Sequence, residues 1–189
     1  MRWFVLYARS RGVPLALAAI LLSTTAFWAL ATLDGAPDQA LSVLVLVAGT
    51  AFAAAGLAGQ DVALDRIAAI RWPPRRAAHV LAIAVVVGSA LLFLQNWGDP
   101  LSPAGVVLRD TFGLTGLTAL GAALCGGQYA WTFPIGWFAF SLGVPMDTEV
   151  LSQVAGWLWQ PPGTPAATAA ALVLGIGGTL VYAACGNRR

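Results

Sequence analysis

The chain has 189 residues, of which 59% are hydrophobic and 10% are charged, and its formal net charge is +2. Soluble domains carry roughly 25% charged residues, so this composition excludes an ordinary soluble domain and indicates an all-α, polytopic membrane protein. The sequence contains no lysine, which excludes a phosphate-binding loop of the form GxxxxGKS or GxxxxGKT. If ATP drives this protein, another chain must bind it.

The N-terminal stretch RWFVLYARSRG, within residues 1–12, is amphipathic. It predicts an elbow helix that lies in the inner membrane interface, anchored by Trp3, Arg9 and Arg11. A plain cytoplasmic stub is the alternative. The apolar run that follows is about 20 residues long, longer than the hydrophobic region of a typical signal peptide, so we expect it to remain as the first span.

Six apolar segments are predicted to cross the membrane. A helix needs about 20 apolar residues to cross a hydrocarbon core of about 30 Å. Residues 105–144 form an apolar stretch of about twice that length, and we divide it at Gly126-Gly127-Gln128. The six spans are residues 14–33, 40–57, 77–94, 105–125, 129–144 and 165–185. We expect residues 1–189 to form a single transmembrane domain.

The arginines predict the orientation of these spans. With the N-terminus inside, nine of the ten basic residues lie on the cytoplasmic side and only Arg109 lies outside. Short cytoplasmic loops of membrane proteins are enriched in arginine in this way. We therefore expect a multi-pass protein of the plasma membrane with both termini in the cytoplasm.

The sequence GQDVALDRIAAIRWPPRR, residues 59–76, is the only sizeable cytoplasmic loop of this topology. At helical spacing Asp61, Leu64, Asp65 and Arg71 share one face, whereas the opposite face is apolar and interrupted by Arg66. Acids are repelled by an anionic leaflet, so the polar face suits a protein partner in the cytosol. A solvated loop whose arginines only set the topology is the alternative.

Two further segments are expected at the membrane surface. Pro73-Pro74 should end the cytoplasmic helix, which leaves Arg75 and Arg76 at the headgroups as anchors where the third span begins. Residues 145–164 have apolar side chains three, four and seven positions apart, ending near Trp157. They predict a short extracellular interfacial helix that dips its aromatic face into the lipid.

Arg109 and Asp110 are adjacent near the start of the fourth span. A charge in the hydrocarbon costs about 2.5 kcal/mol or more, so the two residues need water or a partner. They either line an outer vestibule that contacts cargo, or they lie at the interface and pair locally. No catalytic, cofactor-binding or metal site is expected. The single histidine, His79, is predicted on the opposite side of the membrane from most acids, which disfavours a nucleophilic triad. Asp61 and Asp65 have no histidine or third carboxylate nearby to complete a metal site.

Small residues recur in the fourth and sixth spans, where they permit close approach of helices. Packing within one chain and a seam between two subunits are both open interpretations of these glycines. Cys125 and Cys185 are too few for a disulfide framework, and we expect them to be reduced packing residues.

In this order the parts resemble the permease subunits of type-2 ABC transporters. The elbow helix corresponds to RWFVLYARSRG, the coupling helix between spans two and three to QDVALDRIAAIRW, and the extracellular helix before span six to TEVLSQVAGWLWQ. The stretch RDTFGLTGLTALGAALCGG is similar to the fourth span of small permease-like proteins in actinobacterial ABC transporter operons. The resemblance covers nearly the whole chain and concerns its architecture.

This resemblance implies that two permease subunits, identical or different, assemble in the lipid. Each would seat its coupling helix in a separate ABC ATPase that holds ATP and Mg, and Asp61, Leu64, Asp65, Arg66 and Arg71 would contact that ATPase. The chain would itself hold no cofactor and bind no nucleic acid. Because the spans carry almost no buried charge, the expected cargo is hydrophobic or amphipathic, such as a lipid, a peptide or a drug-like molecule.

Two other classes of function stay open. One is the substrate-capture subunit of an energy-coupling-factor importer, and the other is a nontransporting membrane scaffold or immunity protein. An import capture subunit docks through small-residue faces of its spans and needs no charged cytoplasmic helix. Residues 59–76 therefore favour the exporter permease, which is not expected to be an enzyme by itself.

Overall fold

The computed structural model describes residues 39–57, 72–97 and 100–187, together with residues 18, 21–23, 25, 26 and 29. This part of the chain contains helices and no strand, which confirms the all-α class. The elements are α3 (Gln39–Ala53), η1 (Ala54–Leu57), α5 (Trp72–Leu94), η2 (Gln95–Trp97), α6 (Ala104–Cys125), η3 (Gly127–Tyr129), α7 (Thr132–Ser141), α8 (Val150–Ala155), η4 (Trp157–Trp159) and α9 (Pro165–Cys185).

Three of these helices are long and apolar enough to cross a membrane. They are the 19 residues Gln39–Leu57, which join α3 to η1, the 23 residues of α5 and the 21 residues of α9. α6 has 22 residues, but it carries Arg109 and Asp110 and many glycines and threonines, which lower its mean hydropathy. The described residues thus form a helical membrane protein with three clear spanning candidates.

The fifth predicted span, residues 129–144, is wrong in length. The helix in this region, α7, has only 10 residues, which is about 15 Å of rise against about 30 Å of hydrocarbon. Tyr129 belongs to η3, and the last turn of α7 ends at Ser141, ahead of Gly143 and Pro145. Apolar composition alone therefore overestimated this helix, because the glycine and the proline end it early.

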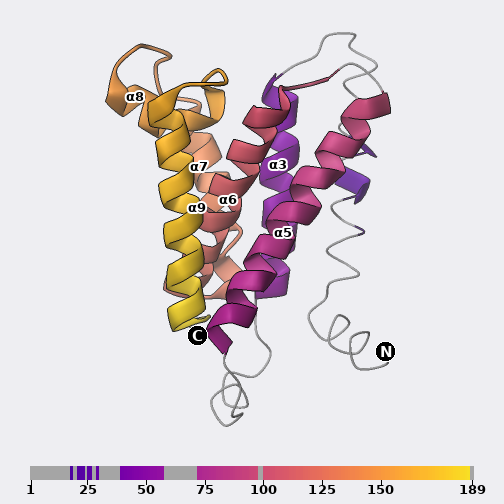
Figure 1. Ribbon diagram of the computed structural model, residues 1–189, viewed down its shortest axis with the longest axis vertical. Helices are drawn as coiled ribbons and strands as arrows, with labels where there is room; N and C mark the ends of the chain where they lie inside the picture. The colour runs from indigo at the N-terminus through magenta and orange to yellow at the C-terminus, as the bar shows by residue number, and fades with distance from the viewer. Residues whose placement is uncertain are drawn as a thin grey trace.

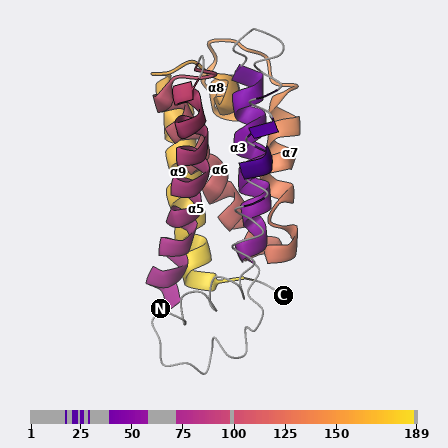
Figure 2. The ribbon, with the colours of Figure 1, turned by 90° about the vertical axis from the view of Figure 1, so that its right-hand side faces the viewer.

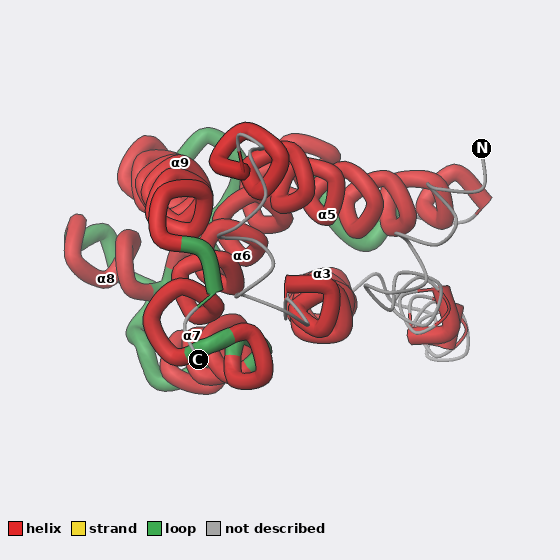
Figure 3. The backbone as a smooth tube through the Cα atoms, turned by 90° about the horizontal axis from the view of Figure 1, so that it is seen from below, coloured by secondary structure: helices red, strands yellow, loops and turns green. Residues whose placement is uncertain are grey.

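α6 occupies the centre of the bundle. It contacts α3, α5, α7 and α9, and its contact with α9 is the most extensive in the molecule. Figure 3, which views the bundle along its long axis, shows α6 with these four helices around it. Most of the side chains of α6 therefore meet protein and not lipid.

The bundle has two chemically different ends. We call the end at which α5 begins and α9 finishes the arginine end, because Arg75 and Arg76 lie in the first turns of α5. α8 lies at the opposite end (Figures 1 and 2), where Asp147 and Glu149 are exposed. The long helices connect the two ends, since each runs along the long axis of the molecule.

The glycines of α6 and α9 bring these two helices into direct backbone contact. A Cβ added to Gly116 would collide with the backbone of Leu174 and Gly175, and one added to Gly178 would collide with the carbonyl of Gly116. Gly175 is covered by the ring of Phe112. These glycines thus serve packing within the chain, as close helix approach requires, and the seam between subunits is not where they are used.

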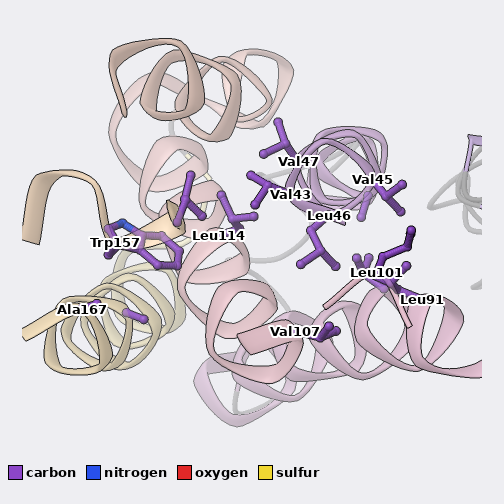
Figure 4. Packing of buried hydrophobic residues seen from close by; sticks show 14 residues of the cluster. Val43, Val45, Leu46, Val47, Leu91, Leu101, Val107, Leu114, Trp157 and Ala167 are labelled. Carbon is purple, nitrogen blue, oxygen red and sulfur yellow. The ribbon is translucent and has the colours of Figure 1, made fainter. Parts of the chain in front are cut away.

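Apolar side chains fill the space between the helices in two clusters. The larger one, shown in Figure 4, joins Leu46 of α3, Leu91 of α5, Leu114 of α6 and Trp157 of η4. The smaller one lies nearer the arginine end and includes Leu57 and Tyr182. Both clusters draw on α5, α6 and α9, so the short η4 and η1 turns, which supply Trp157 and Leu57, are held by the same packing as the long helices.

Three predicted helix boundaries can be compared with the structure. The division at Gly126 is confirmed, since α6 ends at Cys125 and Gly126 has a φ of 99° that favours glycine. α9 covers the predicted residues 165–185 and has a proline in its first turn, where the missing N–H is tolerated. α5, however, begins at Trp72 and not at residue 77, because Pro73-Pro74 opens this helix instead of ending the preceding one.

Both cysteines are exposed and free. Cys125 is the last residue of α6 and Cys185 the last residue of α9, so both thiols lie near the arginine end. They are unpaired, as expected of reduced cysteines, but their exposure contradicts the expectation that they are packing residues.

Candidate functional site

The only ion pair that the structure shows in the described residues lies near the start of α6. The Nε of Arg109 donates to Oδ1 of Asp110 at 2.8 Å, and the two side chains expose only 6% and 1% of their surface. Charged hydrogen bonds of this length are the strong ones. The pair is therefore an enclosed local contact.

Arg109 also binds the chain between η4 and α9. Its Nη2 donates to the carbonyl of Gln160 at 3.0 Å and its Nη1 to the carbonyl of Pro161 at 3.4 Å. Pro161 has no N–H to give to a helix, and the two carbonyls accept from the guanidinium. One arginine of α6 thereby holds a segment about fifty positions later in the sequence.

One carboxylate oxygen of Asp110 has no hydrogen-bond partner among the described residues. This oxygen, Oδ2, is buried. A buried carboxylate oxygen without a partner is costly, and a buried water is the usual solution. The geometry describes local pairing, while a role of Arg109 and Asp110 in a cargo vestibule remains a prediction.

Trp157 is the largest fully buried side chain, and sequence analysis assigned it the wrong environment. Its ring packs against Gly113, where an added Cβ would lie 2.6 Å from the ring carbon Cη2, and beside Ala171 of α9. Leu158 is buried as well, whereas Val150 and Leu151 of α8 are 68% and 76% exposed. The aromatic face of residues 145–164 therefore enters the protein, because Gly113 leaves room for an indole ring.

The segment around η4 is fixed to the other helices by hydrogen bonds. Trp159 donates from Nε1 to Oγ of Ser141 at the end of α7, at 2.9 Å. Gln39, the first residue of α3, donates from Nε2 to the carbonyl of Leu158 at 3.2 Å. Together with Arg109, these contacts tie η4 to α3, α6 and α7. We call residues 157–161 the plug.

The arginine end has its own contacts between distant segments. The hydroxyl of Tyr182 on α9 donates to the carbonyl of Leu57 at 3.0 Å. The guanidinium of Arg76 lies against Gly186, and the amide of Gly127 donates to the side chain of Asn187. The end of η1, the start of α5, η3 and the end of α9 therefore meet at this one end.

Most residues proposed for coupling and anchoring lie outside the described residues. These are Asp61, Leu64, Asp65, Arg66 and Arg71 of the predicted coupling helix, and Trp3, Arg9 and Arg11 of the predicted elbow helix. Arg75 and Arg76 are described, and they belong to α5. Leu57 and Trp72, which flank residues 58–71, both lie at the arginine end.

Comparison with protein families, with curated proteins and with solved structures finds no match to this chain.

Sequence analysis missed the residues that complete these contacts. Gln160 and Pro161 act through backbone carbonyls, which any residue could supply, so no sequence signal marks them. Tyr182 is a tyrosine near the end of an apolar helix, and that position is also typical of an interfacial aromatic residue. The one available signal is Arg109, the single arginine outside the predicted cytoplasmic side, which needs acceptors wherever it lies.

Proposed function

We propose that this chain is the permease subunit of an ATP-driven exporter of the type-2 ABC class. In this proposal the chain crosses the plasma membrane six times, with η3 and α7 together as a short fifth crossing, and both termini lie in the cytoplasm. A separate ATPase binds ATP and Mg, and a second permease subunit completes the translocation unit. The cargo is a hydrophobic or amphipathic molecule.

One observation carries the proposal. The two residues that flank residues 58–71, Leu57 and Trp72, lie at the same end as Arg75 and Arg76. The exposed acids Asp147 and Glu149 lie at the other end. This charge separation supports the orientation in which residues 59–76 start and finish on the cytoplasmic side.

The plug gives further support. In the architecture that the sequence resembles, a helical segment on the outer side precedes the last span. Here α8 and the plug occupy that place in the chain, between α7 and α9, and they lie at the end of the bundle opposite Arg75 and Arg76. Gly116, Gly175 and Gly178 are used within the chain, so these three residues are not available as a small-residue face on which a capture subunit of an importer would dock.

Affinity purification tests the ATPase partner. The tagged chain, isolated in mild detergent from its native host, is expected to bring ATP hydrolysis with it. The double variant Asp61→Arg with Asp65→Arg should lose that activity. The matched control reverses the same number of acids at the opposite end, Asp147→Arg with Glu149→Arg, and should keep it. Recovery of the unmodified chain without a nucleotide-binding protein, or equal loss in both variants, contradicts the proposal.

Thiol labelling tests the orientation separately. In a background with Cys125→Ser and Cys185→Ser, a single cysteine is placed at exposed Thr148 or at exposed Arg75. A membrane-impermeant maleimide should label Thr148→Cys in intact cells and should label Arg75→Cys only after permeabilisation. The reverse pattern would put residues 59–76 outside and exclude a cytosolic ATPase as their partner.

A further inference from the structure

An apolar groove lies between α3 with η1 on one side and η3 with α7 on the other. Its volume is about 540 Å³, which is within the range of about 300–1,000 Å³ typical of small-molecule sites. The groove is lined by Ala48, Ala51, Phe52 and Ala55 along one wall, by Trp131 and Ile135 along the other, and by Gly127 and Gln128 at its end. None of them contributes to the contacts of Arg109 or to the plug.

The chemistry of the groove changes along its length. The walls carry alanine, isoleucine and aromatic side chains, and the amide of Gln128 lies at the end near η3. Tyr129 and Trp131, which follow Gln128 closely in the chain, are 53% and 46% exposed. Exposed tyrosine and tryptophan favour the headgroup level of a bilayer, so the polar end of the groove is at that level and its apolar part lies deeper.

Positive charge is present at the same end. Gly127, which lines the groove, donates its amide hydrogen to Asn187. Gly186, which precedes Asn187 in the chain, lies against the guanidinium of Arg76. This guanidinium lies at the same end of the bundle as Gln128, and positive charge near the membrane surface attracts anionic lipids.

The small side chains of α3 explain why lipid can enter beside α7. η3 and α7 together run from the arginine end, where Gly127 contacts Asn187, to the plug, where Ser141 contacts Trp159, so this segment lies beside α3 along the groove. Small side chains on α3, Ala48 and Ala51, leave a concave strip beside it. A narrow apolar strip that ends at a polar amide has the polarity order of a lipid molecule.

We propose that this groove binds one acyl chain of an anionic phospholipid, with the headgroup at Gln128. The chain lies against Ala48, Ala51 and Ala55, and Ile135 and Trp131 enclose it from the other side. This site does not depend on an ATPase or on transport, so it can be tested independently of the proposed function.

Photo-crosslinking tests the occupant. The purified full chain is reconstituted in phosphatidylcholine vesicles that contain phosphatidylglycerol with a diazirine on its acyl chain. Crosslinks are mapped by mass spectrometry and are expected on peptides that contain residues 48–55 and 131–135. Ala51→Phe should lower these crosslinks about tenfold, which corresponds to about 1.4 kcal/mol of binding free energy.

A matched variant separates filling of the groove from a general effect of phenylalanine. Ala82 is exposed on α5 and lies outside the groove lining, so Ala82→Phe should leave the crosslinks unchanged. If Ala51→Phe unfolds the protein, Ile135→Trp fills the groove from the other wall, with Ile176→Trp on exposed α9 surface as its control. Both groove variants should lose the crosslinks while both controls keep them.

Two results would overturn the proposal. Equal crosslinking in the groove variants and their controls would show that the lipid probe does not occupy this site. Crosslinks between two copies of the chain at residues 48–55, with loss of a dimer in Ala51→Phe, would show that a second copy covers the groove.

Replacing the probe by phosphatidylcholine with a diazirine on its acyl chain should reduce the crosslinks, and Arg76→Gln should remove that difference between the two lipids.

Discussion

α5 and α6 have nearly equal lengths, 23 and 22 residues, but they face different surroundings. Of an apolar stretch of 18 residues within α5, only 22% is buried inside the protein. Leu81, Val85 and Phe93 are 46%, 68% and 62% exposed. α6 is buried along most of its length by glycine, threonine and alanine as well as by leucine. Of the two, only α5 is apolar enough to qualify as a span by composition.

This difference shows what hydropathy measures in such a protein. A helix that faces lipid must carry apolar side chains on its outer surface, whereas a helix surrounded by other helices needs small residues and can tolerate a paired charge. α6 satisfies the second requirement with Gly116 and with the Arg109–Asp110 pair. Substitutions should therefore cost much more around α6 than on lipid-facing surfaces.

The largest effect is expected at the plug. Trp157→Ala removes a fully buried indole ring from beside Gly113, and truncation of a buried tryptophan typically costs about 3–5 kcal/mol of unfolding free energy. Trp131→Ala, which removes the same ring from a 46% exposed position, should cost far less. Unfolding in detergent micelles, followed by circular dichroism, compares the two. Similar losses would mean that the plug is not part of the core.

The second effect concerns the ion pair. Asp110→Asn keeps the size of the side chain and one oxygen but removes the charge that Arg109 meets at 2.8 Å. Hydrogen bonds to charged groups contribute about 1.5–3 kcal/mol, so a loss of that order is expected. Asp147→Asn at an exposed carboxylate is the control and should stay within about 0.5 kcal/mol. A larger loss in the control, measured in the same unfolding assay, would contradict the assignment.

The sequence predicted the regular helices well because their ends carry strong local signals. Gly126 and Pro165 mark the boundaries of α6 and α9, and the structure places both boundaries at those residues. The predicted helix boundaries were wrong where the same residue types are compatible with two structures. Pro73-Pro74 can end one helix or open the next, and residues 129–144 are apolar throughout although only 10 of them form α7.

The candidate site was predictable only in part, because its contacts join segments far apart in the chain. The pairing of Arg109 with Asp110 was one of two stated alternatives, since adjacent opposite charges in an apolar stretch need each other. The carbonyls of Gln160 and Pro161 are invisible in a sequence, and so is the space above Gly113 that accepts Trp157. The groove is equally hidden, because alanines on α3 look the same whether a helix or a lipid covers them.

A third effect is expected at the contact between α6 and α9. Gly178→Ala places a methyl group on the carbonyl of Gly116, and overpacking of this kind typically costs about 1–3 kcal/mol. Gly177→Ala makes the same change one residue earlier, where an added Cβ meets nothing within 4 Å, and it should be neutral within about 0.5 kcal/mol. Thermal unfolding in detergent distinguishes them. A neutral Gly178→Ala would show that the two helices can separate without cost.

The smallest effect is expected at the arginine end. Tyr182→Phe removes the hydroxyl that donates to the carbonyl of Leu57 at 3.0 Å, while the ring keeps its place in the smaller apolar cluster. A buried hydrogen bond of this kind contributes about 1 kcal/mol. Tyr129→Phe, at a 53% exposed tyrosine, is the control. Because this hydrogen bond holds Leu57, the last residue of η1, Tyr182→Phe should also speed amide hydrogen exchange near Leu57. An unchanged exchange rate would mean that α9 does not hold this end of η1.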